Sequence, residues 1–183
     1  MNIRGTAISG VVVLETKPCS DHRGSFARLY CEHELAPVLG DSRVVQINQS
    51  RTAAVGAIRG MHFQRPPHGE LKVVRCLKGK VWDVAIDLRA GSLTLFQWHA
   101  EELSPENTRA LVIPEGCAHG FQVIEPDSEL LYLHTAFYMP AAEGGVRHDD
   151  PRLAVPWPLP VTDISLRDSA LPLIGHDFPG IDV

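Results

Sequence analysis

The sequence predicts an all-β protein, a sandwich or a barrel built from many short strands. Short apolar or alternating segments recur along the chain, with turn-forming Pro and Gly residues between them at intervals of about 8–12 residues. Helix signals are weak, and neither an internal repeat nor a low-complexity segment is visible. This punctuation is typical of short strands that are joined by turns.

Each strand is expected from its own side-chain pattern. Residues 81–88 alternate between two faces, with Asp83 and Asp87 on one face and Trp82 on the other, and this alternation predicts a half-buried strand. Residues 71–76 form a short apolar segment that is followed by a turn at Gly79. The other expected strands are residues 93–99, 108–113, 121–124 and 129–138.

Helices are expected to be short and peripheral. Residues 32–39 are a helix candidate, and residues 104–107 are expected to form a turn or a single helical turn. From Pro151 onward the chain is rich in Pro, and we expect it to wrap around the barrel as extended chain or loop. No linker divides the chain, so residues 1–183 are expected to form one domain, which is long enough to bury a substantial core.

Composition and charge narrow the class of function. Hydrophobic residues make up 44% of the chain and charged residues 21%, as in soluble globular proteins. The formal net charge is −5 and the isoelectric point is about 6.0, whereas a general nucleic-acid binder carries a basic surface. A few local Arg and Lys residues still suffice to bind one small anionic molecule.

The cysteines and the N-terminal segment indicate the compartment. Cys19, Cys31, Cys76 and Cys117 fit neither a zinc site nor a dense disulfide framework, so we expect free thiols in a reducing compartment. The apolar residues 8–14 are too few for a membrane span and lack the features of a signal peptide. We therefore expect a cytoplasmic protein that has no membrane partner.

Two histidines lie in segments that suit a functional site. His62 belongs to the segment Arg-Gly-Met-His-Phe-Gln at residues 59–64. In a regular strand Arg59 points away from the face that carries His62, but a bulge at Gly60 lets both side chains face one cavity. His119 lies in a turn rich in Pro and Gly, which presents it at the start of a strand.

Three further residues have both a functional and an ordinary explanation. Lys72 lies in an apolar strand and faces either solvent or the barrel interior, where a fixed positive charge stabilises an oxyanion. Tyr132, taken alone, is explained by packing in the core. Asp168, taken alone, is a surface carboxylate, and it gains interest if it orients a histidine, as carboxylates do in acid–base dyads.

These residues occur in one order with the segments 21–26, 46–50, 59–64, 83–89, 114–121, 149–151, 157–158 and 165–168. The ordered set resembles the dTDP-4-dehydrorhamnose 3,5-epimerase family, the RmlC-like cupins. The resemblance implies a jelly-roll (cupin-type) β-barrel with short peripheral helices, a homodimer, a nucleotide-sugar substrate in the barrel mouth, no metal ion and no other cofactor. The sequence agrees on the metal, because His62-Phe63-Gln64 replaces the clustered histidines of metal-binding cupins.

The resemblance also implies residue roles. His62 would be the general base that removes a proton beside the 4-keto group of a sugar, and Asp168 would orient it. Lys72 would face the enolate oxygen, and Tyr132 would return a proton from the opposite face of the ring. The implied substrate-binding residues are Arg23, Phe26, Arg28, Gln46, Asn48, Arg59, His119, Tyr138, Glu143 and Arg167.

Three positions depart from the family's pattern. The thymidine-binding segment commonly ends in Glu, which accepts the N3–H of thymine, whereas this chain has Arg28, which only donates. Arg28 therefore favours a base with acceptors, such as cytosine or guanine, or binds phosphate, or points away. Arg167 replaces the usual Lys and keeps the charge, and Gln49 replaces a more usual His.

The predicted function is epimerisation at C3, C5 or both of an NDP-4-keto-6-deoxyhexose, with dTDP-4-dehydro-6-deoxyglucose as the expected substrate, in deoxysugar or surface-polysaccharide synthesis. Three alternatives stay open: a single-carbon epimerase of a CDP- or GDP-linked sugar, a cupin that shifts the keto group between C3 and C4, and a sugar-nucleotide-binding cupin without catalysis. The complete set of His62, Lys72, Tyr132 and Asp168 argues against the last two.

Overall fold

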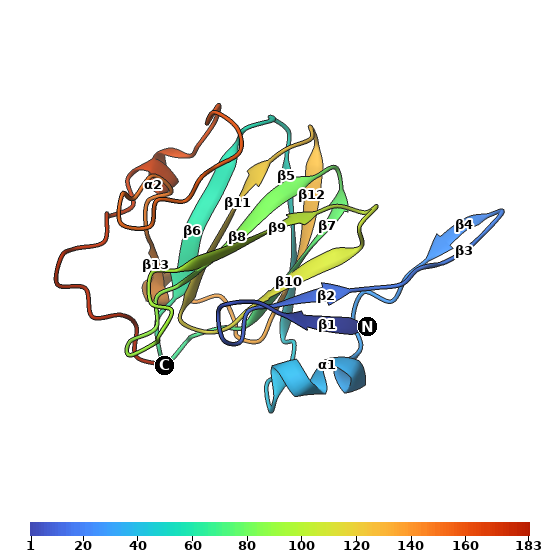
Figure 1. The fold of residues 1–183 in the computed structure, drawn as a ribbon, viewed down its shortest axis with the longest axis horizontal. Helices are drawn as coiled ribbons and strands as arrows, with labels where there is room; N and C mark the ends of the chain where they lie inside the picture. The colour runs from blue at the N-terminus through green and yellow to red at the C-terminus, as the bar shows by residue number, and fades with distance from the viewer.

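Two antiparallel sheets face each other and form a barrel in the computed structural model, which describes all 183 residues (Figure 1). One sheet has the strand order β1-β2-β10-β7-β12-β5, the other has the order β13-β6-β11-β8-β9, and β3 and β4 pair separately. The predicted all-β jelly-roll fold is confirmed. The strands are β1 (Asn2–Gly5), β2 (Val12–Glu15), β3 (Cys19–Asp21), β4 (Gly24–Phe26), β5 (Gln46–Thr52), β6 (Ile58–Gln64), β7 (Lys72–Lys78), β8 (Val81–Asp87), β9 (Trp98–Leu103), β10 (Arg109–Ile113), β11 (Cys117–Val123), β12 (Ser128–His134) and β13 (Glu143–Gly145).

The core lies between the sheets and also on their outer faces. Val74, Leu111 and Phe121 are among the buried side chains of the largest apolar cluster, to which both sheets contribute. The C-terminal chain covers the outer face of the five-stranded sheet, where Val155 and Ile181 pack in a second cluster. The expectation that the chain beyond Pro151 wraps around the barrel is therefore confirmed.

This covering explains why the prediction for β8 was wrong. The strand is buried on both faces, and only Trp82 in it is half-buried. Val81 and Ala85 pack between the sheets, while Val84 and Ile86 pack under the C-terminal chain. The alternation in the sequence therefore separates two buried faces of the strand, and neither face is exposed to solvent.

The predicted strand at residues 93–99 was also placed wrongly, because β9 begins only at Trp98. The hydroxyl groups of Ser92 and Thr94 each donate to Asp87 Oδ2 at 2.6 Å, and Phe96 has a φ of 69°. These hydrogen bonds and this turn hold the preceding residues as a loop. The strand expected at residues 129–138 likewise ends earlier, at His134.

The helices are short and peripheral, as expected. Helix α1 (Glu32–Leu39) lies where it was predicted, and its Leu35 and Leu39 pack on the six-stranded sheet. The turn expected at residues 104–107 is found at residues 105–108. Two helical elements were not predicted, the 3-10 helix η1 (Pro140–Ala142) and helix α2 (Leu166–Ser169). No helix in the structure combines the length and the apolar character that a membrane-spanning helix needs.

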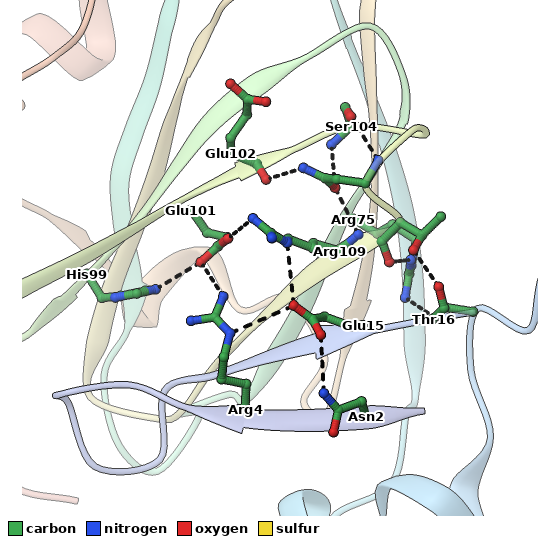
Figure 2. A network of polar contacts seen from close by, with 12 residues as sticks. Asn2, Arg4, Glu15, Thr16, Arg75, His99, Glu101, Glu102, Ser104 and Arg109 are labelled. Carbon is green, nitrogen blue, oxygen red and sulfur yellow. Dashed lines mark hydrogen bonds and ion pairs between the residues drawn. The ribbon is translucent and has the colours of Figure 1, made fainter. Parts of the chain in front are cut away.

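A polar network joins the two sheets on the side where β9 approaches β10 (Figure 2). Glu101 of β9 is buried and accepts hydrogen bonds from Arg4 of β1 at 3.0 Å and from Arg109 of β10 at 2.6 Å. Glu15 of β2 lies 3.8 Å from Arg4 and 3.6 Å from Arg109. Glu101 is thus the carboxylate that connects an edge strand of one sheet to the other sheet.

Replacing Glu101 with alanine is expected to lower the free energy of unfolding by about 1–3 kcal/mol, because two arginines lose their shared buried partner. Urea unfolding followed by circular dichroism measures this change. The neighbouring Glu102, whose side chain is 53% exposed, supplies the matched control. If Glu101→Ala and Glu102→Ala have the same stability, Glu101 does not hold the sheets together.

Candidate active site

A cavity of about 520 Å³ opens between the two sheets and is bounded in part by the segment around α2. Its wall contains side chains of β5, β6, β7, β11 and β12, so both sheets contribute to it. Ten of the residues singled out in the sequence line this one cavity. They are Asn48, Arg59, His62, Lys72, His119, Tyr132, Tyr138, Glu143, Arg167 and Asp168.

His62 and Asp168 form a dyad in this cavity. His62 Nε2 lies 2.8 Å from Asp168 Oδ1, and the backbone N–H of Gly60 donates to Asp168 Oδ2 at 3.1 Å. Ser165 caps α2 by accepting from the backbone N–H of Asp168 at 3.0 Å, which holds this residue beside β6. Burial raises the pKa of the Asp168 carboxyl, but the hydrogen bonds from His62 and Gly60 outweigh it, and the pKa is lowered.

Of the two possibilities that the sequence left open at Gly60, the structure has the bulge, which brings Arg59 and His62 to the same cavity. Three steps along β6, from Arg59 to His62, pair with two steps along β11, from Phe121 to His119. Gly60 has a φ of 122°, and a Cβ atom there would lie 2.5 Å from Gly120 Cα. Only glycine fits this conformation and this close approach.

Tyr132 enters the cavity from the six-stranded sheet, opposite the sheet that carries His62. Its hydroxyl lies 3.0 Å from Ser50 Oγ on the neighbouring strand β5. Burial raises the pKa of Tyr132, so the phenol remains protonated at neutral pH. The arrangement places a neutral proton donor and a histidine–carboxylate pair on opposite walls.

Further polar groups complete the walls. His119 Nε2 lies 2.7 Å from Asp83 Oδ1, which makes a second histidine–carboxylate pair. Glu143 accepts from the Tyr138 hydroxyl at 2.7 Å and forms an ion pair with Arg167. These contacts tie β13, the loop after β12 and α2 together at the mouth of the cavity.

Several polar residues of the site were not singled out in the sequence, among them Asp83, Ser50, Glu70 and His134. Asp83 and Ser50 support His119 and Tyr132, and Glu70 and His134 line the cavity near Lys72. A period-two argument finds the last two, because Glu70 precedes Lys72 by two residues and His134 follows Tyr132 by two. No signal in the sequence distinguishes Ser50 from an ordinary strand serine.

Four of the expected binding residues lie outside this cavity. Gln46 contacts it indirectly, because its side chain accepts from the backbone N–H of Tyr138 at 3.1 Å. Arg23 and Phe26 lie on the β3–β4 hairpin, which extends away from the barrel (Figure 1). Arg28 forms an ion pair with Glu34 of α1 in the same chain.

The fold and the cavity together define a cupin-type barrel equipped for acid–base chemistry. To remove a proton from carbon and return it, an enzyme needs a base, an acid and a group that stabilises the oxyanion. The cavity contains a His–Asp dyad, a protonated tyrosine and a lysine. No three His, Cys, Asp or Glu side chains are grouped as the ligands of a metal ion would be.

Comparison with known proteins identifies the family. The sequence model of the dTDP-4-dehydrorhamnose 3,5-epimerase family matches residues 5–176, and the chain belongs to this family. It is 40% identical over 171 residues to dTDP-4-dehydrorhamnose 3,5-epimerase of Salmonella typhimurium, covering 92% of this chain and 93% of that protein. It is 38% identical over 169 residues to dTDP-4-dehydrorhamnose 3-epimerase of Streptomyces niveus, covering 92% of this chain and 81% of that protein.

A solved structure agrees with both the fold and the family. The 3,5-epimerase of Legionella pneumophila, in complex with dTDP-4-keto-L-rhamnose, superposes with a TM-score of 0.89 at 38% sequence identity. The match covers 94% of this chain and 92% of that one.

Proposed function

We propose that this chain epimerises C3 and C5 of dTDP-4-dehydro-6-deoxyglucose, in the synthesis of a deoxysugar or a surface polysaccharide. The observation that supports this proposal most directly is that His62 and Tyr132 come from opposite sheets and line one cavity. A base on one face of a sugar ring and an acid on the other invert a carbon. A pure binding protein has no need for this pairing.

In the proposed reaction His62 removes the proton from the carbon beside the 4-keto group. Asp168 accepts one N–H of the imidazolium and stabilises it. The electrons of the broken C–H bond move to the keto oxygen, where the Lys72 ammonium stabilises the enolate. Tyr132 then protonates the carbon from the opposite face, and its proton is restored from solvent while His62 releases its own.

The relatives support the dTDP-linked sugar and leave two regiochemical outcomes. Both curated relatives carry dTDP-4-dehydrorhamnose in their names, one as a 3,5-epimerase and one as a 3-epimerase. Arg28 is paired with Glu34, so we do not expect it to recognise the nucleotide base in the cavity of its own chain. We favour inversion at both carbons, since the acid Tyr132 is present.

Deuterium exchange followed by NMR tests the function. The protein is incubated in D₂O with EDTA and dTDP-4-dehydro-6-deoxyglucose, and deuterium is followed at C3 and C5. Uptake at both carbons with formation of the inverted product supports the proposal, including its independence of a metal. Uptake at one carbon indicates a single-carbon epimerase, and migration of the keto group indicates the other isomerase class. If no exchange occurs, the CDP- and GDP-linked sugars are tried before the chain is assigned as a binding protein.

We further propose that the chain acts as a homodimer in which the β3–β4 hairpin of each copy reaches the cavity of the other. The hairpin contains only two three-residue strands, and Phe26 at its end is 77% exposed. Isolated two-stranded hairpins are marginally stable in water. A second copy covers the hairpin and brings Arg23 and Phe26 to a nucleotide-binding position.

Complementation between two inactive chains tests this arrangement. Arg23→Glu and His62→Ala are each expected to lose activity at low substrate concentration. Each mixed dimer then contains one site with native His62 and a native hairpin, and one site that lacks both. Because about half of the randomly formed dimers are mixed, mixing restores about a quarter of the native activity. Arg43→Glu, on an arginine that is exposed by 82%, is the control for the charge change. No recovery, or a mass of 20.1 kDa by light scattering, contradicts the shared site.

We also propose that residues 1–183 act as one domain in the cytoplasm. The family match over residues 5–176 supports the first point. The four free cysteines support the second, because a reducing compartment keeps thiols unpaired.

A further inference from the structure

Glu70, Lys72 and His134 meet at one end of the cavity because of the strand register. Lys72 of β7 and His134 of β12 are directly paired across the two strands. Glu70 precedes Lys72 by two residues, so an extended chain turns both side chains to the same side. All three line the cavity beside Tyr132.

The contacts among these residues use both oxygens of the carboxylate. Glu70 Oε1 lies 2.8 Å from Lys72 Nζ, and Glu70 Oε2 lies 2.7 Å from His134 Nδ1. The side chains are only 7% exposed for Lys72, 9% for Glu70 and 12% for His134. Both oxygens of the Glu70 carboxylate therefore have a partner, and the carboxylate fixes the position of Lys72 Nζ.

We propose that Glu70 is a positioning residue, which keeps the Lys72 ammonium charged and fixed on the cavity wall, and that His134 holds Glu70 in place. This inference rests on the proposed function, in which Lys72 faces the enolate oxygen. Glu70 itself does not touch the substrate in this scheme. It acts through the lysine.

Burial makes this partner necessary. An ammonium group that is removed from water loses its proton more easily unless an anion lies close to it. Lysine also has a long flexible side chain, and a displacement of about 1 Å from the reacting atoms costs roughly 10²-fold in rate. Glu70 addresses both problems, and it occupies only one of the three N–H donors of Lys72.

Glu70 is itself anionic over the whole working range. Burial raises the pKa of its carboxyl, but the hydrogen bond from His134 and the nearby Lys72 ammonium outweigh burial and lower the pKa to about 2. The charge pairing with Lys72 is therefore present at neutral pH.

Three other acids in or beside the cavity have partners of their own. Asp168 is bound to His62, Asp83 to His119, and Glu143 to Tyr138 and Arg167. None of these carboxylates pairs with Lys72. The other titratable groups that line the cavity around the cluster are Arg59, His62, His119, Tyr132, Tyr138, Glu143, Asp163, Arg167 and Asp168.

The variant Glu70→Gln tests the proposal, since glutamine keeps the size of the side chain and removes its charge. We expect kcat to fall by about 10²-fold, with a much smaller change in KM. We also expect the alkaline limb of the pH profile of kcat/KM to move to lower pH. Glu70→Asp restores the charge, so it should return the alkaline limb while kcat stays reduced, because the shorter side chain displaces the lysine.

A second readout does not depend on activity. The chain has four lysines, Lys17, Lys72, Lys78 and Lys80, so lysine labelled with ¹³C at Cε yields four NMR signals, and Lys72→Arg assigns one of them. In Glu70→Gln we expect the Lys72 signal to move and to become narrower, because the ammonium loses its buried partner and the side chain gains mobility. Glu125→Gln is the matched control, because the exposed Glu125 lies 3.3 Å from another lysine, Lys80, outside the cavity. It should change neither activity nor the Lys72 signal.

The outcomes separate this inference from the proposed function. If Lys72→Ala keeps native activity, the role of Lys72 in the proposed reaction is contradicted. If Lys72→Ala is inactive but Glu70→Gln keeps the native kcat, pH profile and Lys72 signal, only the positioning role is overturned. Should Glu70→Gln fail to fold, Glu70→Asp decides: native kcat overturns the proposal, and a reduced kcat with a native alkaline limb supports it.

Discussion

Replacing His62 with alanine is expected to lower kcat for epimerisation by at least about 10²–10⁴-fold, the usual contribution of a general base. Deuterium exchange at C3 and C5 should fall by the same factor, because no carbon is deprotonated without the base. The ring is held only by Asp168 and is 30% exposed, so the fold should survive its removal. NMR in D₂O measures the exchange, and circular dichroism checks the fold.

The control for this variant is His176→Ala, since His176 is fully exposed and lies outside the cavity. It should keep native activity and stability. Most of the native exchange rate in a folded His62→Ala protein would remove His62 from its role. His119, the other cavity histidine that is paired with a buried aspartate, would then be the candidate for the general base.

Replacing Tyr132 with phenylalanine is expected to separate inversion from exchange. His62 still removes the proton, and it can return a solvent proton to the same face, so deuterium enters the substrate without inversion. Protonation from the opposite face loses its acid, so the rate of inversion should fall by about 10²–10⁴-fold. Comparing deuterium uptake in recovered substrate with formation of the inverted product by NMR measures the two rates separately.

Tyr30→Phe is the matched control, because Tyr30 packs beside α1 and the six-stranded sheet, away from the cavity. It should change neither rate. Native inversion in Tyr132→Phe would exclude the tyrosine as the acid. An equal loss of exchange and inversion would show that Tyr132 takes part in the deprotonation step.

The strands that were predicted correctly are those whose local pattern is strong. The apolar segment at residues 71–76 overlaps β7, and residues 108–113 and 121–124 overlap β10 and β11. The strand β5 escaped prediction, because its Gln, Asn, Ser, Arg and Thr side chains are mostly exposed or line the polar cavity. Strand ends were less predictable, since hydrogen bonds such as those of Ser92 and Thr94 to Asp87 decide them.

The site was predictable as a set of residues but not as a set of contacts. Ten of the expected residues line one cavity, whereas Arg23, Phe26 and Arg28 lie away from it in the same chain. Period two along a strand is sufficient to find Glu70 and His134 once Lys72 and Tyr132 are known. It does not reveal that one carboxylate joins the lysine to the histidine, because that depends on the pairing of β7 with β12.

The sequence by itself determined the all-β class, because alternation and turn residues are local properties of the chain, and the order of its motifs predicted the acid–base residues through a family resemblance. Only the tertiary structure decided that Asp168, 106 residues away, binds His62, and that Tyr132 faces the cavity from the other sheet. It also decided that β8 is buried on both faces and that the hairpin lies outside the cavity of its own chain. Such contacts depend on strand register and on how distant segments pack, and a short segment of the sequence predicts neither of them.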